Sequence, residues 1–246
     1  RNEVDFFLSI RDGEAYSQGV TNPDQNWSIM YQAGCTTMAA WANAANCAIL
    51  AESFRIHGDK ELCQYYTNEA IKAFKFAGKQ TNLQLDDTQD IGSARMRGRD
   101  FKQMAAAYLY NVTGDTQWEN IMAEESVVKN DHTPLFKKGR NDVYYQIWGA
   151  AAYLTCPHER HYQELYQNIK ASIHAQADEN NVSHMSTRPS RRTANDPRWQ
   201  VSENLQIVMM AHYIAENAQR KALLEQAMYM EAGWGLGRNP SNTIEM

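Results

Sequence analysis

The sequence of 246 residues lacks any apolar run near the ~20 residues that a helix needs to span a bilayer. This absence argues against a helical membrane protein. Positive charge is also scarce, because 24 Lys and Arg residues face 29 Asp and Glu residues, for a net charge of −5. Nucleic-acid binders need clustered cations, so we expect no nucleic-acid partner. With 43% hydrophobic residues, the composition predicts a folded protein.

Cysteine is sparse as well. The four cysteines, Cys35, Cys47, Cys63 and Cys156, lie far apart and form no C-x-x-C pair. They are too few for a disulfide scaffold and wrongly spaced for a structural zinc site, so we expect buried free thiols, no metal and no cofactor. Sparse unpaired thiols favour a cytoplasmic location, while a secreted or periplasmic one stays open.

Helical periodicity runs through most of the chain. Small and apolar residues recur at three- and four-residue steps over 34–54, far longer than an ordinary strand. Apolar residues at the start, over 4–10, also look helical. No segment alternates polar and apolar residues for long, so we expect little sheet and a single all-α domain over 1–246. Further helices are predicted over 60–76, 100–111, 118–128, 143–154, 161–177, 200–215 and 220–230.

Two tight turns share one pattern. Gly58-Asp59 and Gly114-Asp115 each separate two predicted helices. Glycine leaves a helix easily with a positive φ, and aspartate caps the helix that follows. Gly78 is expected to end its helix in the same left-handed conformation. The pattern therefore predicts antiparallel helical hairpins.

The other connections include four long polar loops, over 13–28, 80–93, 131–142 and 180–199. Long loops on a rigid helical array are common positions for binding sites. Tetratricopeptide repeats would require a 34-residue period and a motif that the sequence lacks. We expect a closed toroid of unequal hairpins rather than an open solenoid.

Aromatic residues gather in or beside these loops and at helix ends. Such rings stack on the apolar faces of sugars, although core packing is the alternative for each of them. Trp27 and Trp199 have polar neighbours, which favours a binding role. The residues that we expect to contact a sugar are Trp27, Tyr31, Tyr145, Trp148 and Trp199.

Five carboxylates lie near the loops. Each is a candidate for a catalytic pair, with a solvated loop or a helix cap as the alternative. They are Asp86, Asp87, Asp90, Asp142 and Glu203.

Three other motifs have ordinary explanations. His158 and His161 lack the H-E-x-x-H spacing of zinc proteases, so an exposed helix start is the better interpretation. The glycine-rich run 233–237 lacks the pattern of a phosphate-binding loop and predicts a helix end. The basic run 188–198 predicts a solvated turn or internal ion pairs, with an anion site as the alternative.

Four stretches together resemble glycoside hydrolase family 9. The run 5–16 resembles the opening helix and D-G-x-x-Y motif of that family, and 36–52 resembles its Ala-rich helix. The run 108–115 resembles a Y-L-x-x-T-G-D turn, and 236–240, Leu-Gly-Arg-Asn-Pro, resembles an L-G-x-N-P element. The matches cover the chain in the family's order, and the last is the most specific.

The resemblance implies an (α/α)6 barrel of inner and outer helices that hydrolyses β-1,4-linked glucans with inversion. An Asp of a D-A-G-D motif acts as base and a Glu as general acid, with the two carboxyls about 6.5–9.5 Å apart. Both elements should lie outside the sequence, before Arg1 and after Met246. We therefore expect an incomplete middle portion of the barrel, with no catalytic residue and no turnover alone.

The ending 237–246 resembles the exo-β-D-glucosaminidase branch more than the cellulases. An amino-sugar substrate favours carboxylates near its ammonium group, and Asp142 and Glu203 are the candidates. The expected function is that of a fragment of an endoglucanase-related glycosidase, with a glucan or a chitosan- or chitin-derived oligosaccharide as its partner. The oligomeric state stays open. The alternative is a non-enzymatic helical scaffold that binds a glycan or peptide on its loop-rich face.

Overall fold

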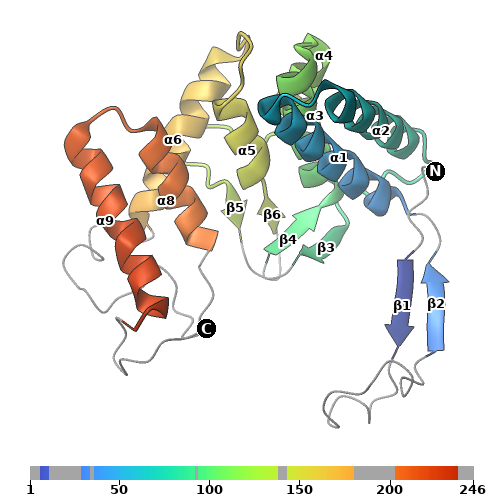
Figure 1. The fold of residues 1–246 in the computed structure, drawn as a ribbon, viewed down its shortest axis with the longest axis horizontal. Coiled ribbons are helices and arrows are strands. Elements are labelled where there is room, and N and C mark those ends of the chain that lie inside the picture. Colours follow the sequence, from blue (N-terminus) through green and yellow to red (C-terminus); the bar gives the residue numbers. More distant parts are fainter. Residues whose placement is uncertain are drawn as a thin grey trace.

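The computed structural model describes residues 6–10, 29–33, 36–91, 94–137, 143–179 and 203–237, with backbone alone at 6–10, 29–33, 90–91, 94, 179, 203–204 and 234–235. The described part is mainly helical (Figure 1). Its helices are α1 (Thr37–His57), α2 (Lys60–Gly78), α3 (Gly98–Thr113), α4 (Thr116–Glu125), α5 (Ile147–Leu154), α6 (Gln163–Glu179), α8 (Glu203–Ile214) and α9 (Ala218–Gly235).

Consecutive helices pair into hairpins. The pairs α1 with α2, α3 with α4, and α8 with α9 pack along their lengths. One helix of each pair also contacts the next hairpin, so that α1, α3, α5 and α8 form a continuous inner layer. Figure 1 shows these hairpins as an arc with α2 near one end and α9 at the other. The predicted helical class is confirmed, with boundaries shifted by a few residues.

The two Gly-Asp turns fold as the sequence predicts. Gly58 and Gly114 have φ values of 90° and 68°. Asp59 caps α2 by accepting a hydrogen bond from the Leu62 amide at 3.0 Å, and Asp115 caps α4 in the same way. Each turn is therefore fixed by its own few residues.

The prediction for Gly78 is wrong. Gly78 is the last residue of α2, and the residue that follows it, Lys79, has a right-handed φ of −95°. The Lys79 amide donates to the Phe76 carbonyl at 3.1 Å. The chain leaves this helix through a right-handed turn, which requires no positive φ and so no glycine.

Three antiparallel strand pairs correct the expectation for two segments. Residues 4–10 were expected to be helical, but Phe6 pairs with Ala33 and Ile10 with Ile29. A short apolar run has the same appearance in a helix and a strand, and only the distant partner decides. Tyr144 and Tyr145, expected within a helix over 143–154, likewise form a short strand before it. The strands are β1 (Phe6–Ile10) with β2 (Ile29–Ala33), β3 (Thr88–Ile91) with β4 (Ala94–Arg97), and β5 (Phe136–Lys137) with β6 (Tyr144–Tyr145).

The core joins small residues with a few large rings. The alanines of α1, among them Ala44, Ala45 and Ala48, are fully buried and let neighbouring helices approach closely. Phe74 of α2 packs edge-on against Trp41 of α1, with ring centroids 4.9 Å apart, and against Trp118 of α4 at 5.1 Å. Phe74 thus links the first two hairpins.

The inner layer ends at α8 with an apolar flank that no described residue covers. Ile207, Val208 and Ala211 are buried, whereas Met209 and Tyr213, one turn apart, are 55% and 64% exposed. Single exposed apolar side chains are common on protein surfaces, and Met209 and Tyr213 are two such side chains on one side of α8.

The cysteines that the structure describes are free thiols. Cys156 is buried, and Cys47 and Cys63 are half-buried, so the expectation of buried thiols is met fully by Cys156 alone. Burial raises the pKa of the Cys47 and Cys156 thiols, which disfavours the reactive thiolate. Cys35 lies outside the described residues. Over the same described ranges, no helix combines the length and apolar character needed to cross a bilayer.

Candidate functional site

The candidate site lies at the end of the helices where α3 and α5 begin. Figure 1 shows β3, β4, β5 and β6 together at this end, opposite the tight Gly-Asp turns. We call this end the loop face. It carries the described parts of two of the long polar loops, 80–93 and 131–142.

The 80–87 segment is attached to the start of α1. The Met38 amide at the helix N-terminus donates to Gln84 Oε1 at 3.0 Å, and Trp41 Nε1 donates to the Leu83 carbonyl at 2.9 Å. Gly98 at the start of α3 approaches the same segment so closely that a Cβ there would lie 2.3 Å from the Gln84 carbonyl oxygen. The loop is thus held between two helix N-termini.

Asp100 connects the elements below the loop face. Its side chain is fully buried and forms an ion pair with Arg97 at 2.7 Å. The carboxylate also accepts from the Arg97 and Tyr145 amides at 2.9 and 3.1 Å, and from Gln146 Nε2 at 3.0 Å. A buried carboxylate is stable only with such partners, so Asp100 has a structural role.

Gln146 extends this network. Its Nε2 also donates to the Glu125 carbonyl at 2.9 Å, while its Oε1 accepts from the Val127 amide at 2.8 Å. Its own amide donates to the Leu135 carbonyl at 2.8 Å. One buried side chain therefore joins α5 to the connection that follows α4.

Two aromatic side chains of the loop face are half-buried. Tyr144 lies beneath the guanidinium of Arg97, 5.4 Å from its ring centroid. Burial raises the pKa of the Tyr144 hydroxyl, with Arg97 acting in the opposite direction, so the phenol stays protonated and can donate. Trp148 packs against Tyr145 with ring centroids 5.2 Å apart. Partly exposed rings of this kind can stack on a sugar.

The described carboxylates of the loop face are engaged within the protein. Asp86 accepts from Arg99 at 3.1 Å, although its side chain is 80% exposed. Asp87 accepts from Gln84 Nε2 at 3.0 Å. With Asp100 buried, none of these three has the features of a free catalytic acid or base.

Of the predicted sugar contacts, the structure brings two together. Trp148 is half-buried at the start of α5. Tyr145 is 2% exposed, lies between Phe136 and Trp148, and donates its hydroxyl to Gln206 Oε1 at 3.0 Å. Tyr145 therefore occupies a core position in which its ring presents no open face.

The remaining predicted residues are located only in part. Tyr31 lies in the middle of β2 and Glu203 is the first residue of α8, and the structure describes neither side chain. Asp90 lies in β3, and its side chain is not described either. Trp27, Asp142, Trp199 and the basic run 188–198 lie outside the described residues.

Sequence reasoning missed Arg97 and Gln146, and it left Tyr144, an aromatic residue beside a loop, out of the expected sugar contacts. The sequence did carry a signal for Asp100. This acid lies three residues after Arg97 at a helix start, where an acidic residue often closes a capping box. Nothing local indicates that Asp100 reaches across to Tyr145 and Gln146, because these residues belong to a separate hairpin.

The two histidines of the 158–161 motif have separate structural partners. His158 Nε2 lies 3.1 Å from the Asn111 carbonyl, and His161 Nδ1 lies 2.6 Å from Glu119 Oε2. Helix α6 begins only at Gln163, so the prediction of a helix start at this motif is wrong. Within the described ranges, no cluster of three or more His, Cys, Asp or Glu residues fits a metal ion.

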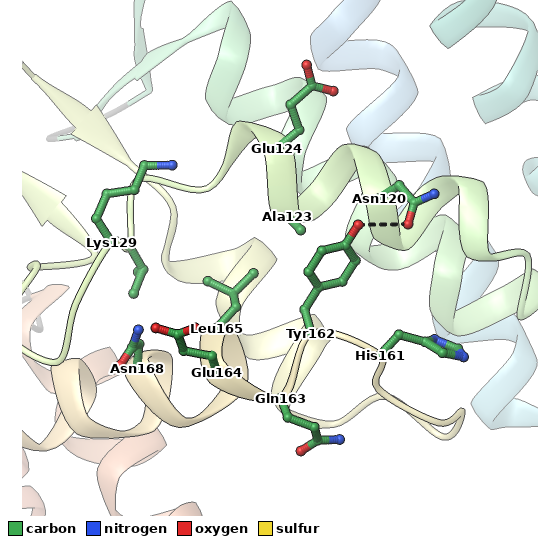
Figure 2. A pocket seen from close by; sticks show the side chains of 11 residues that line it. Asn120, Ala123, Glu124, Lys129, His161, Tyr162, Gln163, Glu164, Leu165 and Asn168 are labelled. Carbon is green, nitrogen blue, oxygen red and sulfur yellow. Dashed lines mark hydrogen bonds between the residues drawn. The ribbon is translucent and has the colours of Figure 1, made fainter.

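A hollow, which we call the α4–α6 groove, lies between α4 and α6, away from the loop face. It has a volume of about 700 Å³. Figure 2 shows Asn120, Ala123 and Glu124 from α4 on one side and Tyr162 and Leu165 on the other.

No protein-family model and no curated protein matches this chain. Solved structures do match. Among them are the GH family 9 endoglucanase J30 (18% identity, TM-score 0.64), a metagenome-derived glycoside hydrolase family 9 endoglucanase (19%, 0.67) and a Bacteroides ovatus GH9 protein (18%, 0.65).

These alignments cover 90%, 91% and 92% of this chain, but 41%, 40% and 44% of the respective neighbours. At such identities the similarity shows the fold. The expected architecture is confirmed: the chain has the fold of part of the (α/α)6 barrel of family 9 glycoside hydrolases and spans about two fifths of the length of the endoglucanases that it resembles.

Proposed function

We propose that this chain is part of a glycoside hydrolase that acts on β-1,4-linked oligosaccharides. The observation that carries the proposal is the alignment of about 90% of the chain with structures described as family 9 endoglucanases. The loop face supports it, because two half-buried rings are held there on a rigid hydrogen-bonded base. In this proposal, the chain contributes barrel helices and sugar contacts, while residues outside 1–246 supply the catalytic acid and base.

Trp148 is the principal sugar contact of the described loop face in this proposal. Its ring packs against Tyr145, and the Tyr144 hydroxyl, which donates to the Pro134 carbonyl at 3.0 Å, can still accept from a sugar hydroxyl. Trp27, Tyr31 and Trp199 complete the set of rings. Tyr145 contributes by positioning Trp148 rather than by touching the sugar.

The finer proposal is a glucosamine-containing substrate, of the chitosan or chitin-derived type. Asp142 and Glu203 are proposed to lie near the ammonium group, since a carboxylate is its natural partner. This branch rests on the resemblance of 237–246 to exo-β-D-glucosaminidases.

Calorimetric titration with cellohexaose and with a chitosan hexamer tests the proposal. Trp148→Ala and Trp199→Ala should each weaken binding by about 1–3 kcal/mol if the rings stack on sugar. Tyr65→Ala is the control, because Tyr65 is a 55% exposed ring on the distant helix α2. Equal affinities for all variants, or no binding of either oligosaccharide, would overturn the proposal. Tighter binding of cellohexaose would remove the glucosaminidase branch.

The non-enzymatic scaffold is the second candidate. It is favoured by the internal bonds of Asp86, Asp87 and Asp100, which leave these described carboxylates engaged. An activity assay on the longest natural polypeptide that contains this chain distinguishes the hydrolase from the scaffold. Release of shorter sugars supports the hydrolase, whereas tight binding without cleavage supports the scaffold.

A further inference from the structure

The α4–α6 groove is lined by both apolar and polar side chains. Ala123, Val128 and Leu165 are apolar, whereas Asn120 and Glu164 are polar and exposed. Its volume of about 700 Å³ is within the usual range of small-ligand sites, roughly 300–1,000 Å³. The groove lies between α4 and α6 and shares no lining residue with the loop face.

Tyr162 gives the groove a fixed aromatic surface. Its side chain is 39% exposed, and its hydroxyl donates to Asn120 Oδ1 at 3.0 Å (Figure 2). The neighbouring residue, His161, is anchored to the buried Glu119 through both its amide, at 2.8 Å, and its ring, at 2.6 Å. Because the backbone and the hydroxyl are both held, the ring loses little freedom when a ligand stacks on it.

The charged groups at the rim are available to a ligand. Over the described residues, no ion pair or side-chain hydrogen bond engages the carboxylates of Glu124 and Glu164 or the ammonium of Lys129. Figure 2 shows the Glu124 side chain directed away from Tyr162, so one carboxylate, that of Glu164, and one ammonium, that of Lys129, remain beside the hollow. This balance disfavours phosphate or another anion, which would require several cations.

A sugar chain fits this combination better than an apolar helix or a nucleotide. Sugars pair an apolar ring face with a rim of hydroxyls, and the groove offers an aromatic ring surrounded by amide and carboxylate groups. The unpaired Glu164 carboxylate adds a preference for a positively charged sugar. We propose that the α4–α6 groove is a second glycan site, separate from the loop face, that holds an amino-sugar oligosaccharide across Tyr162 with an ammonium group at Glu164. This inference rests on the proposed function.

The test is a titration with a chitosan hexamer at mildly acidic pH, where its amines are protonated. Tyr162→Ala should weaken the groove site roughly tenfold, or about 1.4 kcal/mol. Glu164→Gln should weaken chitosan binding and reduce its dependence on salt, while binding of cellohexaose stays the same. Tyr65→Ala is the matched control with an exposed ring elsewhere, and thermal unfolding verifies that each variant is folded.

Three outcomes are distinguishable. Loss of one of two binding sites in Tyr162→Ala, with the loop-face site retained, supports the inference. Unchanged chitosan binding in both groove variants, with Trp148→Ala still weakening binding, overturns the groove site alone. Absence of any oligosaccharide binding overturns the proposed function together with the groove.

Discussion

The carboxylate of Asp100 accepts a hydrogen bond from the backbone amide of Tyr145 at 3.1 Å, which joins the start of α3 to the strand that precedes α5. The same carboxylate forms an ion pair with Arg97 and accepts from Gln146. Tyr144, the half-buried ring under Arg97, belongs to the strand that these bonds hold. The geometry of the loop face therefore depends on one buried acid.

Asp100→Ala should destabilise the protein strongly. The substitution leaves Arg97, whose side chain is 19% exposed, without its ion-pair partner and leaves the Tyr145 amide and Gln146 without their acceptor. Removing one partner of a buried pair typically costs roughly 3–5 kcal/mol. Urea denaturation at neutral pH measures the loss as a fall in the free energy of unfolding.

Asp86→Ala is the control for this experiment. Asp86 pairs with Arg99 at 3.1 Å, but its side chain is 80% exposed, so solvent screens the interaction. Exposed pairs contribute about 1 kcal/mol or less. Similar losses for the two variants would contradict the structural role of Asp100.

The tight turns show what the sequence can predict. Gly58 and Gly114 take positive φ and Asp59 and Asp115 cap the following helices, because each interaction lies within about four residues of chain. Helix periodicity is local for the same reason, and it located every described helix. The prediction for Gly78 was wrong because a glycine at a helix end permits a left-handed cap without requiring one.

The site depends on contacts that local patterns do not encode. Tyr145 was chosen as an aromatic residue beside a loop, but burial and its bond to Gln206 place it in the core. Periodicity shows that a segment has an apolar face, and it does not show which neighbour covers that face. The role of Asp100 escaped prediction in the same way, since its partners lie on another hairpin. The first strand pair was missed because β1 needs the distant β2 to form.

Gly98→Ala should lower stability, because the added Cβ would lie 2.3 Å from the Gln84 carbonyl oxygen and 3.1 Å from its carbon. These are backbone atoms, which cannot rotate away as a side chain does. Forcing extra volume into a packed site costs about 1–3 kcal/mol. Thermal or urea unfolding measures the loss.

Gly78→Ala should instead raise the stability of the protein. Its Cβ would meet only Trp41, at 4.0 Å, within a helix and without a positive φ. Alanine should therefore stabilise the protein by about 0.4–1 kcal/mol. If Gly98→Ala proved as stable as Gly78→Ala, the close approach of the loop to α3 would be wrong.

Tyr153→Phe should weaken the link between α4 and α5. The Tyr153 hydroxyl donates to the fully buried Glu119 at 2.7 Å, and water cannot replace it because Tyr153 is fully buried. A hydrogen bond to a charged group contributes about 1.5–3 kcal/mol. Tyr144→Phe, which removes a bond to the Pro134 carbonyl in a half-buried position, should cost less. Equal losses in urea denaturation would contradict the importance of Glu119.

His174 should make stability depend on pH. Burial lowers the pKa of its imidazole, Arg220 and Lys170 lower it further, and Asp178 acts in the opposite direction. Its Nδ1 is buried and has no hydrogen-bond partner among the described residues. The folded protein therefore favours the neutral ring.

The sign follows from the protons bound. Below an unfolded pKa of about 6.5 the unfolded chain takes up a proton at His174 that the folded chain binds only at lower pH. The free energy of unfolding should thus fall as pH decreases from about 6.5 through the folded pKa, and the contribution is fully present above that range. His174→Asn should flatten this part of the profile in urea denaturation at stepped pH. His132→Asn is the control, because the His132 side chain is 81% exposed, and this variant should keep the pH dependence of the wild-type protein. If His174→Asn also kept that pH dependence, the burial of a neutral imidazole at His174 would be contradicted.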